Sequence, residues 1–198
     1  MALTNERIDF LNVSIDGSLP EIIQYTKFVI VLFILSYLMF QKKRKKFICW
    51  FVLFFVMLLD DAFSLHESSG KYLAITLDIQ PFMGLRSVDY GELLYAFAAG
   101  IIILPLMSYC YIFGDKTFKK SFLDLSLLLI VLLFFGIFID MLHSYFSDIY
   151  PLGGIFGLLE DGGEMIALSL IAWYLLFIAI STNNRQVYLH SPLLGMQK

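Results

Sequence analysis

The sequence predicts an all-α, polytopic integral membrane protein, a bundle of about five transmembrane helices. Of its 198 residues, 59% are hydrophobic and only 16% are charged, whereas soluble domains average about 45–50% apolar and about 25% charged residues. The apolar residues gather in five long stretches, which polar segments separate. No internal repeat divides the chain, so we expect residues 1–198 to form a single transmembrane domain.

A helix needs roughly 20 mostly apolar residues to cross a hydrocarbon core about 30 Å thick. The first twenty residues lack a signal-peptide pattern, so we expect the first apolar stretch to remain in the mature protein. The connection between the second and third stretches contains the apolar segment YLAITLDI, which is too short to span and predicts a re-entrant or interfacial piece. Pro105 predicts a kink in the third stretch. The expected spans are about 21–40, 47–67, 90–113, 122–146 and 154–180.

The distribution of Lys and Arg predicts the orientation, because cytoplasmic loops carry an excess of basic residues. One side of the expected bundle has ten basic residues, five of them in the run KKRKK at 42–46, and the other side has four. The sequence therefore predicts an external N-terminus and a cytoplasmic C-terminus. A specific anionic-lipid site at KKRKK is the alternative interpretation of that run.

Acidic and histidine residues concentrate in the outer half of this arrangement. A charged side chain inside a membrane is costly, and it usually faces the bundle interior and has a partner. Here the acids outnumber Lys27, Lys71 and Arg86, so we expect bound protons, a metal cation or a cationic ligand to offset the excess. The acids on the outer side are Asp60, Asp61, Glu67, Asp78, Asp89, Glu92, Asp140, Asp148, Glu160, Asp161 and Glu164.

Helical spacing places several of these side chains on common faces. Asp140 and His143 are three residues apart, and Glu160 and Glu164 are four apart, so each pair shares a helix face. Helical bundles build metal centres from a carboxylate–x–x–His pair and carboxylates on other helices. Histidines with carboxylates suit a divalent transition metal, Zn, Fe or Mn. The predicted metal ligands are His66, Asp140, His143, Glu160 and Asp60.

A second role follows for the carboxylates that are left over. A bound metal turns water into a nucleophile, and Glu164 or Glu67 would then serve as the catalytic general base. The leading hypothesis is a metal-dependent hydrolase or transferase that acts on a lipid-like substrate. The alternatives are a small accessory or assembly subunit of a membrane complex, and a proton- or cation-coupled transporter. A haem between His66 and His143 is a further hypothesis.

Several of these residues also have a purely structural interpretation. Asp89 with Glu92 is typical of a capping pair at a helix start. His66 can be a polar tip at the membrane interface, and His143 can bond Asp140 without a metal. Asp78 and Asp148 fit solvated loops. The sequence leaves these alternatives open.

The formal net charge of −3 argues against nucleic acid as a partner, since that ligand requires a basic surface. The expected partner is the lipid bilayer, and a partner subunit or a homodimer stays open. We expect a multi-pass protein of the bacterial inner (plasma) membrane, with its site on the periplasmic or external side.

Overall fold

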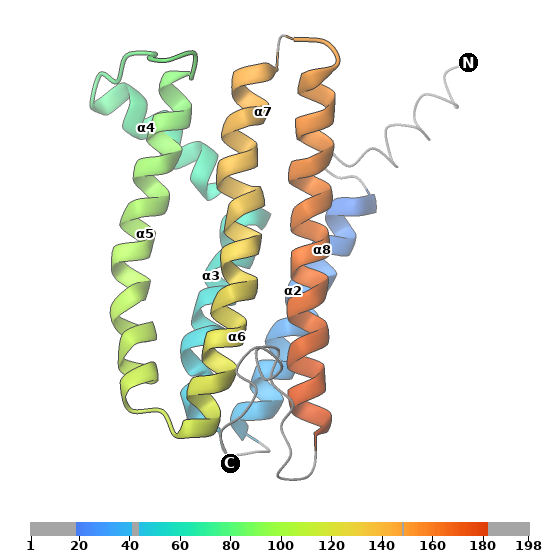
Figure 1. Ribbon diagram of the computed structural model, residues 1–198. Coiled ribbons are helices and arrows are strands. Elements are labelled where there is room, and N and C mark those ends of the chain that lie inside the picture. Colours follow the sequence, from blue (N-terminus) through green and yellow to red (C-terminus); the bar gives the residue numbers. More distant parts are fainter. Residues whose placement is uncertain (1–18, 41–43, 148, 182–198) are drawn as a thin grey trace, which may run out of the picture.

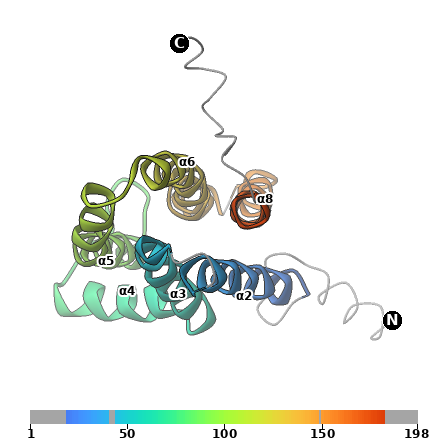
Figure 2. The same cartoon turned by 90° about the horizontal axis from the view of Figure 1, so that it is seen from below.

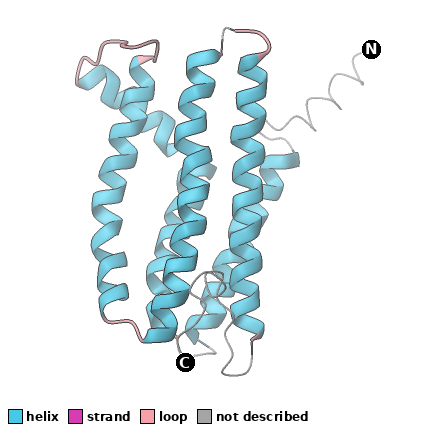
Figure 3. Ribbon diagram, viewed as in Figure 1, coloured by secondary structure: helices cyan, strands magenta, loops and turns pink. Residues whose placement is uncertain are grey.

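The computed structural model describes residues 19–40, 44–147 and 149–181, and in them the protein is built from helices and the loops that join them (Figure 3). Most of the longer helices run roughly along one axis, and α4 lies across it (Figure 1). In order, they are α2 (Leu19–Phe40), the short 3-10 helix η1 (Lys45–Phe47), α3 (Ile48–Ala62), α4 (Leu65–Thr76), α5 (Ser87–Ile112), α6 (Lys116–Leu133), the π-helix η2 (Phe134–Ile139), α7 (Asp140–Phe146) and α8 (Leu152–Ile180).

Four of these helical segments are long and apolar enough to cross a membrane, namely α2, α5, the continuous segment α6–η2–α7, and α8. A fifth span is reached if η1–α3 and α4, which meet at a bend of 72°, count as one. The chain is therefore a membrane protein of four to five candidate spans, in agreement with the expected fold class.

The second expected span, residues 47–67, needs a correction. Helix α3 ends at Ala62, and Ser64 has a left-handed backbone, with φ of 45° and ψ of 45°. A serine in that conformation cannot continue an α-helix. Glu67 therefore lies in the first turn of the separate helix α4, which also contains much of the expected re-entrant segment.

The fourth expected span, residues 122–146, is longer and less regular than predicted. It begins at Lys116, and the π-helix η2 interrupts it just before Asp140. A π-helical turn contains an extra residue and changes which side chains face a neighbouring helix, and such turns are frequent at functional sites. Helix α5 continues through Pro105, and α8 begins at Leu152.

Helix α8 lies at the centre of the packing and α5 at its edge. Within the most apolar window of α8, 44% of the residues are buried, against 11% in α5. Side chains of α2, α3, α6 and α8 make the main core, for example Leu35, Trp50, Leu125 and Ile171. Seen end-on, α6 and α8 lie alongside the row that α2 and α3 form (Figure 2). Large apolar side chains cover the outer surface, as a lipid-facing surface requires.

Candidate metal and carboxylate site

Three of the predicted ligands come together where α7 and α8 run side by side. Asp140, His143 and Glu160 each offer one donor atom, and these atoms all lie within 4.8 Å of one another. His143 Nδ1 lies 2.7 Å from Glu160 Oε2, across the two helices. Asp140 and His143 reach α8 from one face of α7 because they are three residues apart. All three side chains are half-buried.

Glycine in α8 makes room for the His143 ring. A Cβ built on Gly157 would lie 3.1 Å from Cε1 and 3.2 Å from Nε2 of His143. Gly153, four residues earlier, faces the end of the preceding segment, where an added Cβ would lie 2.7 Å from the Ser147 carbonyl oxygen. The pair forms a G-x-x-x-G pattern, which lets two helices approach closely.

Glu164 lies one turn further along α8, and α2 and η2 surround it. Its Oε2 accepts a hydrogen bond of 3.0 Å from Gln24 Nε2 of α2. Its Oε1 lies against Gly136 of the π-helix, where an added Cβ would be only 2.1 Å away. Lys27, one turn after Gln24, donates to the Met165 carbonyl oxygen at 3.0 Å. The Glu164 carboxylate is thus held between two neighbouring elements, α2 and η2.

The bend after α3 forms a second carboxylate–histidine pair. His66 Nδ1 of α4 lies 3.1 Å from Asp60 Oδ2 of α3, because the chain turns back on itself between them. Tyr95 of α5 lies beside the same carboxylate. Glu67 instead forms an exposed ion pair with Lys71, at 3.1 Å and one turn along α4.

At the start of α5, hydrogen-bonded polar side chains connect this helix to α7. Arg86 Nη2 lies 2.7 Å from Asp89 Oδ1 and donates to Ser144 Oγ at 3.0 Å. The Asp89 carboxylate also accepts from the Arg86 backbone N–H at 2.8 Å, so Asp89 caps the start of α5, but its partner in the capping box is Arg86 and not Glu92 as expected. The hydrogen bonds that Arg86 donates to the Asp89 carboxylate raise the pKa of Arg86 above its usual range, which keeps the guanidinium charged.

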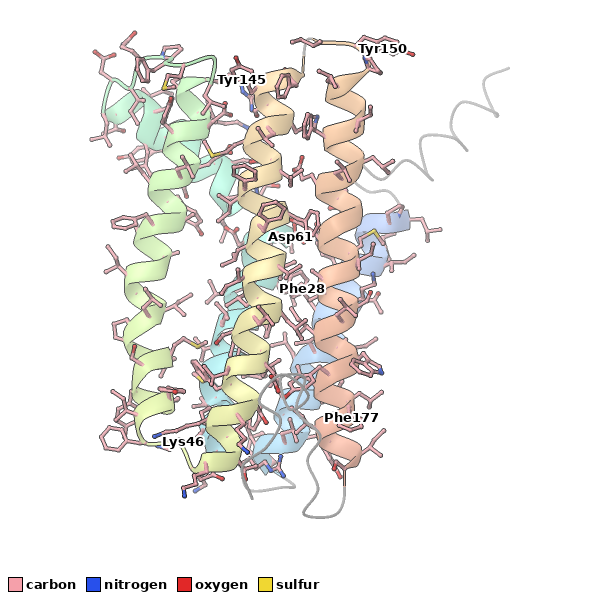
Figure 4. All side chains as sticks on the ribbon, in the orientation of Figure 1. Phe28, Lys46, Asp61, Tyr145, Tyr150 and Phe177 are labelled. Atoms are coloured by element: carbon pink, nitrogen blue, oxygen red, sulfur yellow. The ribbon has the colours of Figure 1, made fainter. Side chains whose placement is uncertain are left out.

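These groups share one electrostatic environment. Asp140 interacts with Asp89, His143 and His66, and Glu92 interacts with Asp140 and His66. Glu164 interacts with Asp61 and Glu160. Acids of α3, α5, α7 and α8 therefore lie close enough to repel one another. Helix α7 and the start of α8 lie at the end of the bundle at which Tyr145 and Tyr150 are labelled, and Asp61 of α3 lies nearer the middle of the helices (Figure 4).

The cations on this side do not balance that charge. Lys71 pairs with Glu67 and Arg86 pairs with Asp89, whereas Lys27 bonds a backbone carbonyl. Across the described ranges, no direct ion pair joins a Lys or Arg to Asp140, Glu160 or Glu164. Asp78 bonds Gln80 in a loop, and Asp148 lies outside the described residues.

Sequence reasoning missed the residues that hold the carboxylates in place. Gln24 and Gly136 fix Glu164, Gly157 accommodates His143, and Ser144 bonds Arg86. The G-x-x-x-G spacing of Gly153 and Gly157 is visible in the sequence and could have indicated a close helix contact. Nothing local indicates which side chain of another helix each glycine meets.

Comparison with known proteins places the chain in one family. The model of the family described as Domain of unknown function (DUF8692) matches residues 22–180, which is most of the chain, so the protein belongs to that family. No curated protein and no solved structure matches it.

Proposed function

We propose that this member of the DUF8692 family binds a divalent transition metal through Asp140, His143 and Glu160 and hydrolyses or transfers a group of a lipid-like substrate. The observation that carries the proposal is the convergence of three donor atoms from α7 and α8 within 4.8 Å. A divalent cation would offset the repulsion among carboxylates that have no direct Lys or Arg partner.

The donor set fits a tetrahedral ion after a small adjustment. Zinc–ligand bonds of about 2.1 Å place neighbouring ligand atoms about 3.4 Å apart. His143 Nδ1 and Glu160 Oε2 are closer than that, at 2.7 Å, and the widest donor pair, within 4.8 Å, is up to about 1.4 Å further apart than that spacing. Both changes would require rotation of these half-buried side chains. An alternative is that Glu160 keeps its bond to Nδ1 and orients the ring, while Nε2 binds the ion.

Three protein ligands leave one coordination position for water or substrate, which is the pattern of catalytic zinc sites. A metal at such a site lowers the pKa of bound water and supplies a nucleophile near neutral pH. Glu164, held by Gln24 one turn from Glu160, is the carboxylate best placed to accept the proton. Glu67 is less suited, because its carboxylate is exposed and paired with Lys71.

The depth of the site supports a lipid-like substrate. The segment α6–η2–α7 has 31 residues and is about 46 Å long, so about 8 Å protrudes at each end of a 30 Å hydrocarbon core. Asp140 precedes the end of α7 by six residues, or about 9 Å. The site then lies near the boundary between hydrocarbon and headgroups, where the ester and phosphoester bonds of lipids are found.

Cation transport is the second candidate function. The position of Glu164 favours it, because this carboxylate lies deeper in the bundle than Asp140 and Glu160. A relay would have to continue past it. The next core residues of α8, however, are Ala167, Leu168 and Ile171, which are all apolar and fully buried. The buried polar pair Tyr174–Asp124 lies ten residues beyond Glu164, about 15 Å along the helix. This arrangement favours a closed site over a path through the membrane.

The proposal also includes an orientation of the protein in the membrane. The basic residues around η1 and the start of α6 lie at the opposite end of the bundle from the carboxylate site (Figure 4). Under the positive-inside rule, the carboxylate site faces the outside of a plasma membrane.

Elemental analysis of the purified protein tests the metal site. Wild-type protein reconstituted with Zn, Mn or Fe should retain about one equivalent of metal after dialysis, because three charged or polar donors chelate it. The variants Asp140→Asn, His143→Ala and Glu160→Gln should lose it. Asp78→Asn, which removes an exposed loop acid, is the matched control and should retain it. A wild-type protein that retains no metal under any of these conditions contradicts the proposal.

Catalysis needs a separate measurement on the metal-loaded protein. Glu164→Gln should keep the metal and lose about 10²–10⁴-fold in turnover of a phospholipid or lipid ester, the usual effect of removing a general base. Glu67→Gln should change turnover little. Equal turnover in wild-type protein and Glu164→Gln would exclude Glu164 from the chemistry while leaving the metal site intact.

A further inference from the structure

The end of the bundle opposite the carboxylate site carries a concentration of basic side chains. They come from η1 and its preceding residue and from the first turns of α6, which lie close together because Phe47 packs edge-on against Phe118 at 5.2 Å. The described residues of this basic cluster are Arg44, Lys45, Lys46, Lys116, Lys119 and Lys120.

Two of these lysines are held over aromatic rings near the end of α5. Lys46 Nζ lies 4.9 Å from the centre of the Tyr109 ring and 5.6 Å from that of Phe113. Lys119 Nζ lies 5.5 Å from the Tyr111 ring. These distances are within the range of cation–π attraction. The rings fix the positions of the ammonium groups without using their N–H donors, of which each lysine has three.

Within the part of the chain that the structure describes, neither ammonium group forms an ion pair with a carboxylate. The nearest acids in the sequence of α6 are Asp115, before its first residue, and Asp124, which is buried and accepts a hydrogen bond from Tyr174 at 2.5 Å. Two fixed positive charges are thus left for an anion.

The location of the rings identifies the kind of anion. Tyr109 and Phe113 are 55% and 63% exposed, on the edge helix α5, so Lys46 lies on the outer perimeter of the bundle and not in an internal pocket. Figure 4 shows Lys46 at the lower end of the helices. In a membrane, that perimeter meets lipid headgroups, and exposed Tyr side chains are typical of this depth.

We propose that Lys46 binds the phosphate of an anionic phospholipid at this end of the bundle, with Tyr109 and Phe113 as its platform, and that Lys119, held over Tyr111, adds positive charge to the same cluster. Basic clusters next to a transmembrane helix attract anionic lipids, and the two aromatic contacts make this a defined site within the cluster. The site is independent of the metal centre, because the two lie at opposite ends of the helices.

Native mass spectrometry of the full chain tests the proposal. Protein purified in detergent would be mixed with equal amounts of phosphatidylglycerol and phosphatidylcholine, and the bound lipids counted. Wild-type protein should prefer phosphatidylglycerol by about tenfold or more, since each lysine near the lipid contributes about a factor of five. The double variant Lys46→Gln/Lys119→Gln should lose most of that preference.

Two further variants distinguish binding at this specific site from a general effect of positive charge. Lys71→Gln removes one positive charge at the other end of the protein and should keep the full preference. Tyr109→Leu leaves every charge in place but removes a ring from Lys46, and it should reduce the preference about two- to fivefold, which corresponds to the loss of roughly 0.5–1 kcal/mol for an exposed cation–π contact.

Three outcomes would overturn the proposal. The first is an equal preference in wild-type protein and the double variant, and the second is an equal loss in Lys71→Gln. The third is displacement of the lipid by inorganic phosphate but not by sodium chloride at the same ionic strength, which would identify a site for soluble anions. Displacement by both salts to the same extent supports a lipid site, since salt screens both alike.

Discussion

The imidazole of His143 lies directly against the backbone of Gly157, so closely that a Cβ on Gly157 would be 3.1 Å from its Cε1. This contact positions the ring for its 2.7 Å hydrogen bond to Glu160. Two helices therefore meet at a glycine so that a histidine from one can reach a carboxylate of the other.

Gly157→Ala should displace the His143 ring by a few tenths of an ångström and weaken metal binding about 10–100-fold, the usual effect of disturbing the groups around a ligand. Titration with a competing chelator would measure it. Gly154→Ala is the matched control, because nothing lies within 4 Å of its added Cβ. It should leave metal affinity unchanged and stabilise the helix by about 0.5–1 kcal/mol. Equal metal affinities in both variants would show that Gly157 does not affect metal binding.

Glu164 and Gly136 should be energetically coupled. Gly136→Ala places a Cβ only 2.1 Å from Glu164 Oε1, so the carboxylate must move and its bond to Gln24 is disturbed. Shortening the acid, with Glu164→Asp, should relieve the clash. We expect a favourable coupling free energy of about 0.5–3 kcal/mol in a double-mutant cycle of unfolding. Strict additivity of the two changes would contradict the contact.

The contact between α4 and α5 depends on Gly91. A Cβ there would lie 2.1 Å from the Gly70 carbonyl oxygen, and backbone atoms cannot move aside as a side-chain tip can. Gly91→Ala should reduce the free energy of unfolding by about 1–3 kcal/mol, measured by denaturation in detergent. Gly100→Ala in the same helix, with open space around its Cβ, should be neutral or stabilising. An equal destabilisation in the two variants would show that any alanine in α5 has this effect, and not the Gly70–Gly91 contact in particular.

Tyr174 and Asp124 form a buried hydrogen bond between α8 and α6, with an oxygen–oxygen distance of 2.5 Å and both residues 2% exposed. Tyr174→Phe removes the donor and should cost about 1–3 kcal/mol of unfolding free energy, because Asp124 loses a partner in a low-dielectric interior. Tyr145→Phe, at a side chain that is 49% exposed, is the control and should cost little. Equal unfolding free energies in the two variants would show that the Tyr174–Asp124 hydrogen bond makes no net contribution to stability.

Ser64 sets the bend between α3 and α4, with a left-handed φ of 45°. Glycine adopts that conformation without a steric penalty, so Ser64→Gly should raise the unfolding free energy by a few tenths to about 1 kcal/mol. Ser64→Ala keeps the penalty and serves as the reference. The distance between labels on α3 and α4 should be the same in both variants. A lengthened distance in Ser64→Gly would show that the bend depends on more than the backbone of this residue.

Apolar stretches predicted most of the helices, because the apolar character that a membrane span needs is a property of each segment by itself. Residues 19–40 and 152–180 are apolar enough to cross a membrane regardless of what they pack against, so their positions could be read directly. The break at Phe63–Ser64 could not, because DDAFSLHE continues a plausible helical pattern and none of its residues forbids a helix. The packing of α4 against α5, where Gly70 meets Gly91, favours the bend.

The candidate site was predictable in part for the same reason. The spacing of Asp140 and His143 is a property of one helix, so their shared face followed from the sequence. Whether Glu160 or Asp60 would meet that face depends on how the helices are rotated and shifted along their axes. The π-helix at Phe134–Ile139 changes that rotation, and it has no clear signature in the sequence.

The sequence by itself determined that this protein is helical, apolar and rich in carboxylates near one end of its spans, since composition and spacing act residue by residue. The tertiary structure decided that Asp140, His143 and Glu160 form one cluster, that His66 pairs with Asp60 instead, and that Glu67 pairs with Lys71 at the surface. Such pairings depend on side chains of different helices lying within a few ångströms. Helix rotation and glycine contacts fix that distance, and no single segment encodes it.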